Sequence, residues 1–113
     1  MKRIIDNQEV EVRRLPDILT MFAVAMTINK KIYHINPTFS SERTLRHELC
    51  HVKQQENLGF WKFLWLYYWN WLKLAIKGKR AYKNNPFELE AKEWQYTPKG
   101  WENVTKDSWR GYV

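Results

Sequence analysis

The sequence predicts an α+β domain in which a small antiparallel sheet, built on a hairpin, packs on one helix, with two further helices beside it. Residues 22–28 and 31–35 are rich in β-branched and aromatic side chains, which favour strands. Residues 40–59 carry apolar side chains at helical spacing, and residues 60–76 are apolar around most of a helix. The 113 residues, 44% apolar and 27% charged, suit a single globular domain over 1–113.

The strands come first along the chain. The N-terminal part is mostly polar, and only Val10-Glu11-Val12 alternates as a short edge strand does. One or two helical turns are expected over 15–22, after Pro16. The strands at 22–28 and 31–35 then flank Asn29-Lys30, a plausible tight turn, so the sequence predicts a hairpin.

The next segment, 40–59, is predicted to be an amphipathic helix. Ser40 is a suitable N-cap, Glu42 stands in the first turn where the helix dipole favours an acid, and Gly59 is a C-terminal stop. An apolar stripe is expected to face the core, and it consists of Leu45, Leu49 and Val52.

Two further helices and a tail complete the chain. Residues 60–76 form the second helix, closed by a basic stretch at 77–80, and residues 87–96 form the third, which Pro98 stops. The tail, 97–113, shows no clear period and is expected to be irregular, with Trp101 and Trp109 anchoring it to the body.

The chemically informative segment is His47-Glu48-Leu49-Cys50-His51, a His-Glu-x-x-His motif. Residues four apart share one face of a helix, so both imidazoles can reach one metal ion, with Glu48 beside the metal-bound water as general base. Cys50 points away from this face and is expected to be a packed thiol.

A catalytic zinc needs three protein ligands and an open position for water. The residues themselves leave His34 and the acids of the third helix as candidates for the third ligand. Glu88 and Glu90 are two residues apart, so they point in different directions and only one of them is expected to bind.

His47-Glu48-x-x-His51 followed by Glu88-Leu89-Glu90-Ala91 resembles the gluzincin zinc metallopeptidases, in particular their minimal single-domain bacterial and phage members. The resemblance covers about 20–96 and implies a zincin-like fold with Glu88 as third ligand. Lys92 stands where the family often has an aspartate that orients a ligating histidine. Glu90 is then either an alternate ligand or a supporting group, and 31–35 is the candidate edge strand that pairs with substrate.

The function implied is that of a Zn²⁺-dependent metalloendopeptidase acting on a peptide or protein substrate, with Glu48 moving the proton. The oxyanion donor remains open among His34, Tyr82, Tyr96 and Arg80. The alternative is a non-catalytic, zinc-stabilised protein that binds a membrane or a protein partner on the same fold.

The net charge of +7 is concentrated in one segment, because residues 57–87 hold six basic side chains and no acidic one. The aromatic-basic helix, 60–80, is interpreted first as a core helix and second as a peripheral membrane or partner surface, while nucleic-acid binding is the least favoured reading. The N-terminal segment lacks the apolar run of a signal peptide, so a cytoplasmic protein, with membrane association in the second reading, is expected.

Overall fold

The computed structural model describes residues 2–15, 25–28, 31–34 and 41–113. Its architecture is α+β, as predicted. The strands are β1 (Lys2–Ile5), β2 (Gln8–Arg14), β3 (Ala25–Ile28) and β4 (Lys31–His34), and the helices are α1 (Glu42–Leu58), α2 (Phe60–Ile76) and α3 (Pro86–Trp94), followed by the 3-10 helices η2 (Gly100–Asn103) and η3 (Ser108–Tyr112).

The strands form one sheet in the order β1-β2-β4-β3. The β3–β4 hairpin is antiparallel as predicted, but β2 and β4 run parallel, so the prediction of a purely antiparallel sheet is wrong. Two edge predictions are also wrong, because β2 lies between β1 and β4, and β4 (the predicted substrate-pairing strand at 31–35) lies between β2 and β3. Among the described strands, β3 therefore forms the edge on that side.

The strand β1, which the polar N-terminal sequence did not predict, pairs with β2 through a two-residue turn. Ile5 lies opposite Gln8, and the turn residues Asp6 and Asn7 have φ angles of 52° and 66°. Positive φ at both positions is typical of the turn type that matches strand twist, and Asp and Asn tolerate it better than most residues. The hairpin thus depends on local turn chemistry more than on hydrophobic alternation.

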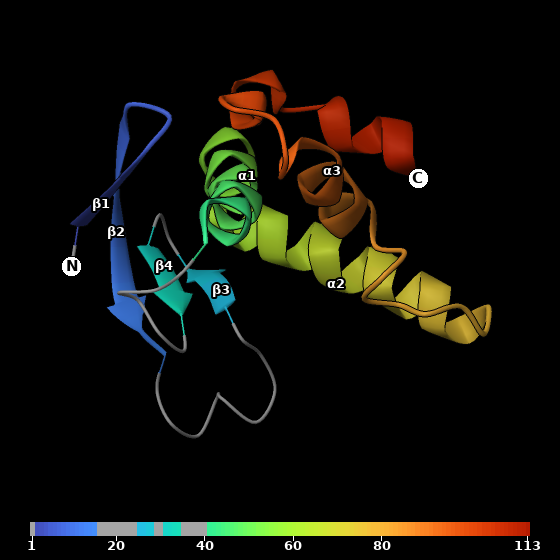
Figure 1. Ribbon diagram of the computed structural model, residues 1–113. Helices are drawn as coiled ribbons and strands as arrows, with labels where there is room; N and C mark the ends of the chain where they lie inside the picture. The colour runs from blue at the N-terminus through green and yellow to red at the C-terminus, as the bar shows by residue number, and fades with distance from the viewer. Residues whose placement is uncertain (1, 16–24, 29–30, 35–40) are drawn as a thin grey trace.

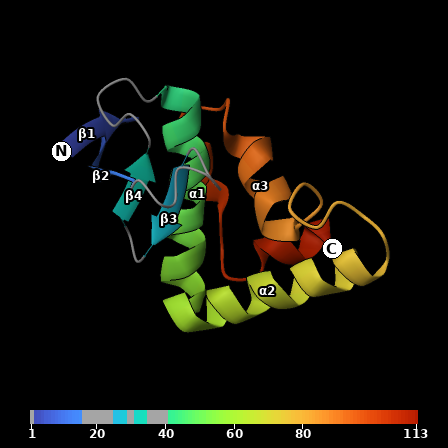
Figure 2. The same ribbon diagram turned by 90° about the horizontal axis from the view of Figure 1, so that it is seen from below.

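Helix α1 lies at the centre of the molecule, with the sheet on one side and α3 on the other (Figures 1 and 2). Its apolar stripe faces the sheet, where Val10 and Val12 of β2 and Ile32 of β4 are buried. The main core also takes Ile5 and, from the tail, Trp101 and Val104, so it extends beyond residues 20–96.

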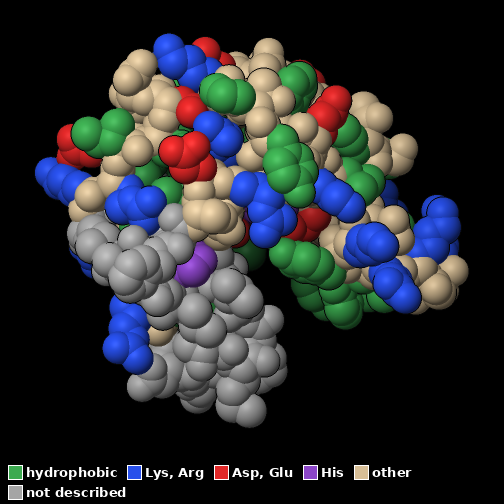
Figure 3. Space-filling model, viewed as in Figure 1, with side chains coloured by type: hydrophobic (Ala, Val, Ile, Leu, Met, Phe, Trp, Pro, Cys, Tyr) green, Lys and Arg blue, Asp and Glu red, His purple; other side chains and the backbone are tan. Residues whose placement is uncertain are grey.

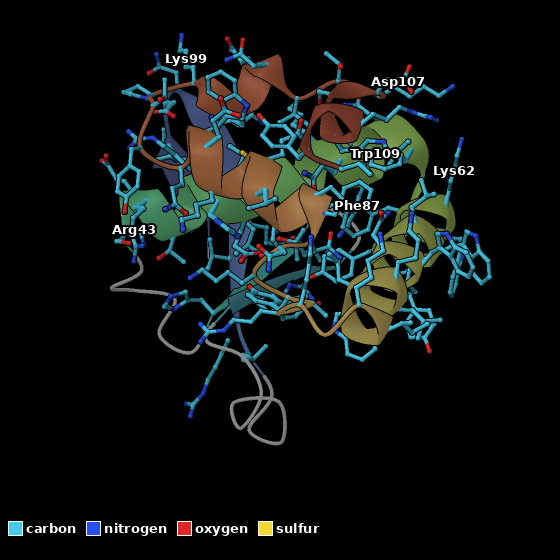
Figure 4. All side chains as sticks on the ribbon, turned by 90° about the vertical axis from the view of Figure 1, so that its right-hand side faces the viewer. Arg43, Lys62, Phe87, Lys99, Asp107 and Trp109 are labelled. Atoms are coloured by element: carbon cyan, nitrogen blue, oxygen red, sulfur yellow. The ribbon has the colours of Figure 1, made fainter. Side chains whose placement is uncertain are left out.

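The end of α1 is joined to α2 by Gly59 alone, and α2 then runs away from the sheet (Figure 2). The prediction that α2 is mainly a core helix is wrong, because its only buried residues are Phe63 and Asn70. Phe63 packs on Phe87 of α3, which stacks in turn on Trp109 at 4.9 Å between ring centroids (Figure 4). This second, smaller cluster holds α2, α3 and the tail together.

Other predictions concern single residues or the tail. The N-cap of α1 is Ser41 and not Ser40, and the Ser41 Oγ accepts a hydrogen bond from the Thr44 amide. The tail contains short 3-10 helices where irregular structure was expected, and the predicted anchors, Trp101 and Trp109, are buried. The helical turns expected over 16–22, the start of the strand at 22–24 and the Asn29-Lys30 turn lie outside the described residues.

Asp6 joins the N-terminal hairpin to α1 and to the tail. Its carboxylate accepts two hydrogen bonds from the Arg46 guanidinium, at 3.1 Å each, and others from the Lys99 amide and the Trp101 indole. The Arg46 guanidinium holds the pKa of Asp6 below its usual range. Both side chains are largely buried, so removing one partner leaves the other charge poorly solvated.

We expect Asp6→Ala to lower the free energy of unfolding by about 3 kcal/mol. The variant leaves the buried Arg46 guanidinium without its carboxylate, and the Lys99 and Trp101 donors without an acceptor. Asp6→Asn keeps a residue that tolerates positive φ and isolates the loss of charge. Urea denaturation measures both. Glu9→Gln, which breaks the exposed Lys2–Glu9 pair, is the control and should change stability by less than about 0.5 kcal/mol. An Asp6→Ala protein as stable as this control would contradict the role of Asp6.

Candidate metal centre

The two histidines of the motif lie on the α1 face that is turned towards α3. They are one helical turn apart, and their ring centroids are 5.1 Å from each other. The neighbouring face of the same helix carries Leu45 and Leu49 into the main core. Because the core side fixes the rotation of α1, the imidazoles are held in a partly buried position between α1 and α3.

Glu88 reaches both histidines from α3. One carboxylate oxygen lies 2.6 Å from His51 Nε2 and the other lies 3.2 Å from His47 Nε2. One ligand atom from each of the three residues lies within 4.8 Å of the other two. The structure therefore brings together His47, His51 and Glu88, which are the three residues that the sequence and its resemblance proposed as ligands.

The start of α3 explains why Glu88 is in this position. Asn85 caps the helix by accepting a hydrogen bond from the Phe87 amide, and Pro86 occupies the first turn, where its missing N–H costs nothing. The Asn85 side chain also donates to the Tyr67 carbonyl of α2, at 3.0 Å. The cap therefore fixes both the first turn of α3, which contains Glu88, and its position against α2.

A further layer of side chains orients the histidines. His51 Nδ1 lies 2.7 Å from Gln54 Oε1, and His47 Nδ1 lies 2.8 Å from Gln95 Oε1. An amide oxygen only accepts hydrogen bonds, so each Nδ1 carries the proton and each Nε2 is directed at the shared centre. A histidine that binds a metal through one ring nitrogen typically donates a hydrogen bond from the other to a neighbouring side chain or carbonyl.

Glu90 lies outside the group of three candidate ligands. It is completely buried and accepts a hydrogen bond from Gln54 Nε2, at 2.8 Å, on the far side of the Gln54 amide from His51. This is the kind of contact that a supporting role requires. Lys92, in the position where the family often has an aspartate, is exposed, and Gln95 contacts His47 instead.

The electrostatics of the centre are those of a buried, charge-compensated cluster. Burial opposes protonation of His51, but the Glu88 carboxylate outweighs it and raises the pKa of His51 to about 9. Burial likewise disfavours the charged form of Glu88, yet the two histidines hold its pKa well below the usual range. In the absence of a metal, the proton on His51 thus compensates the carboxylate. A cation bound among these three groups would take over that role.

Glu48 lies on the sheet side of this centre. It is buried, and its Oε2 accepts a 2.6 Å hydrogen bond from the Thr27 hydroxyl of β3. Gln55 donates to the Thr27 carbonyl, so two α1 side chains hold the edge strand against the motif. The charge of Glu48 also contributes to the raised pKa of His51, which places its carboxylate within electrostatic reach of the centre.

The candidate oxyanion donors lie in different places. Tyr82 is 64% exposed, and desolvation together with the nearby Glu88 carboxylate raises its pKa, so its hydroxyl is neutral. Tyr67 of α2, which sequence reasoning missed, has a pKa raised by the same two causes. Tyr96 and Arg80 are exposed, and His34 is buried on β4, outside the group of three candidate ligands.

Cys50 is a packed thiol, as expected. It is fully buried in the main core, and burial raises its pKa to about 12, which suits a structural cysteine and not a metal-binding thiolate.

Comparison of this chain with protein-family models, with curated proteins and with solved structures finds no match. The interpretation of the centre therefore depends on its own geometry and on the motif.

In the metal-free protein, we expect stability to fall as the pH rises from about 6.5 to about 9. The pKa of His51 is raised on folding from 6.5 to about 9, so its contribution is complete below the lower value and is lost as the pH passes the upper one. Chemical denaturation in the presence of a chelator, repeated across this range, measures the decline. Glu88→Gln should flatten it, because the Glu88 charge is what favours protonated His51. An equal decline in that variant would show that the pair does not control the titration.

Proposed function

We propose that this protein is a zinc-dependent metallopeptidase with a minimal gluzincin-like fold. The observation that carries the proposal is the convergence of His47, His51 and Glu88, with both Nε2 atoms turned towards one carboxylate. Two imidazoles and a carboxylate are a donor set that zinc accepts in hydrolytic enzymes, and a fourth position is left for water. The hydrogen bonds that the two Nδ1 atoms donate to Gln95 and Gln54 match the metal-binding tautomer.

When bound, zinc would supply a Lewis acid that lowers the pKa of a coordinated water towards ~7 and polarises the scissile carbonyl. Glu48 would accept the proton of the attacking water and then deliver it to the leaving amine. The Thr27 hydroxyl orients the Glu48 carboxylate for this transfer. The neutral hydroxyls of Tyr67 and Tyr82, both near enough to Glu88 for its charge to raise their pKa, would be the donors to the developing oxyanion.

The substrate would pair with β3 and not with β4. Of the described strands, β3 forms the sheet edge next to β4, and its Thr27 hydroxyl donates directly to the proposed base, Glu48. A peptide added to this edge would gain main-chain hydrogen bonds while its carbonyl approaches the α1 face.

A second candidate is a non-catalytic protein on the same fold that zinc stabilises. The burial of the centre favours it, because His51 and Glu88 are only 6% and 7% exposed, and closed sites are typical of structural zinc. The two candidates agree on the ligands and differ in hydrolysis, so metal content and activity need separate measurements.

We expect the purified protein to bind one zinc ion per chain by elemental analysis, and His51→Ala to lose it. Glu88→Gln should weaken zinc binding at least about tenfold, because an amide oxygen is a poor replacement for a carboxylate ligand. His34→Gln is the matched control and should keep the ion, since His34 lies outside the centre. Stoichiometric zinc in His51→Ala would contradict the proposed ligands.

We expect Glu48→Gln to keep zinc and to reduce cleavage of unfolded casein or of a peptide library by at least about 100-fold, because the proton acceptor is lost. Glu56→Gln, which changes an exposed acid on the same helix, should cleave as fast as the parent protein. Full activity in Glu48→Gln would contradict the mechanism. If the zinc-loaded parent protein hydrolyses nothing, the non-catalytic candidate is supported.

A further inference from the structure

The outer face of α2 is an unusually large exposed apolar surface. At about 100° per residue, its apolar residues cover roughly 160° of the helix without an intervening charge. Trp61 and Ile76 are each 77% exposed and Trp65 is 63% exposed. The aromatic face, as we call it, consists of Trp61, Leu64, Trp65, Tyr68, Trp69, Trp71, Leu72, Ala75 and Ile76.

Such a surface exceeds what a soluble monomer normally exposes. The four tryptophans alone expose on the order of 500 Å², taking ~250 Å² for a whole Trp side chain. Single exposed apolar residues are common, but a continuous patch of this size is typical of a surface that binds something apolar. The inner side of the same helix is already used, since Phe63 packs on Phe87 and lies near His51.

The charges beside the aromatic face are all positive. Lys62 and Lys73 follow one long border of the face, and both are exposed. Figure 3 shows Lys and Arg side chains among hydrophobic ones over the arm formed by the end of α2, and Figure 4 shows Lys62 directed outwards. On the inner side of α2, Lys73, Lys77 and Lys79 line a hollow of about 540 Å³ that Pro86 and Leu89 of α3 also line. A long basic border beside a tryptophan-rich face matches an anionic lipid surface, where apolar rings enter the interface and lysines reach the headgroups.

Other occupants fit less well. In a symmetric dimer built on this face, each lysine border would meet its own copy or lie close to it, with no acidic residue from 57 to 87 to compensate. Single-stranded nucleic acid would also meet positive charge, but the aliphatic Leu64, Leu72 and Ile76 interrupt the rings that bases would stack on. No helix among the described residues has the length and apolar content needed to cross a bilayer, so α2 would lie in the plane of the interface.

We propose that the protein docks peripherally on anionic lipid membranes, with the aromatic face of α2 inserted at the interface and its lysine border on the headgroups. This proposal is independent of zinc and of hydrolysis.

Vesicle flotation tests the proposal. The protein should float with vesicles of phosphatidylglycerol and phosphatidylcholine in equal parts, and at least tenfold less should float with phosphatidylcholine alone. Its tryptophan emission should shift to shorter wavelength and be quenched by brominated acyl chains, which a purely electrostatic contact would not produce.

The variants separate the two components of binding. Trp61→Ser/Trp65→Ser/Tyr68→Ser should lose binding at least tenfold with an unchanged thermal midpoint, because these side chains are exposed. Ile4→Ser removes an equally exposed apolar side chain from β1 and should bind normally.

Lys62→Glu/Lys73→Glu should also bind at least tenfold more weakly. Lys92→Glu/Lys106→Glu makes the same change in net charge at exposed positions elsewhere and should bind normally.

Several results would overturn the proposal. Failure to float with anionic vesicles removes it, as does equal binding by the triple variant and the parent protein. Sedimentation of the parent protein as a dimer that the triple variant abolishes, without vesicle binding, would identify the face as a self-association surface. Binding to single-stranded oligonucleotides without binding to vesicles would assign it to nucleic acid.

Discussion

The contact between His51 and Glu88, 2.6 Å long and almost fully buried, is the interaction on which the arrangement of the helices depends. Burying an ionised pair costs free energy unless hydrogen bonds replace the lost solvation. On α1, the apolar stripe therefore packs on the sheet while His47 and His51 lie towards α3, where Glu88 meets them. Gln54 and Gln95 complete the polar face by accepting hydrogen bonds from the two histidines.

The same requirement explains how the periphery is organised around this pair. Asn85 holds the start of α3 against the α2 backbone, and Trp109 packs on Phe87 from the tail. On the opposite side, Asp6 ties the β1–β2 turn to α1 and to Lys99. Each of these contacts joins segments distant in sequence, and together they fix α1 against both the sheet and α3.

The sequence predicted the parts of the molecule that depend on local spacing. The His47–His51 pair follows from helix geometry alone, and a helix beginning near Phe87, which the sequence predicted, contains Glu88 in its first turn. The parallel pairing of β2 with β4 could not be predicted, because residues 15–30, which include β3, lie between the two strands in the sequence. No sequence pattern indicates that Gln95 contacts His47. The contact of Gln54 with His51 could have been predicted, because the two residues are three apart on the same helix. The apolar composition of α2 suggested burial. Burial depends on what packs against a helix, and only a small part of α2 is covered by other elements.

Gly59, the single residue between α1 and α2, has a φ angle of 84°, which residues with a Cβ rarely adopt. Its amide closes the last turn of α1 and its carbonyl accepts the first helical hydrogen bond of α2, from Phe63. Because Gly59 takes part in the hydrogen bonds of both helices, its backbone conformation sets the angle between them, and with it the direction of the histidines relative to the outer face of α2. A surface that binds the outer face of α2 would therefore lie at a fixed distance from the candidate metal centre. Substrates confined to the same surface would then be encountered by a search in two dimensions instead of three.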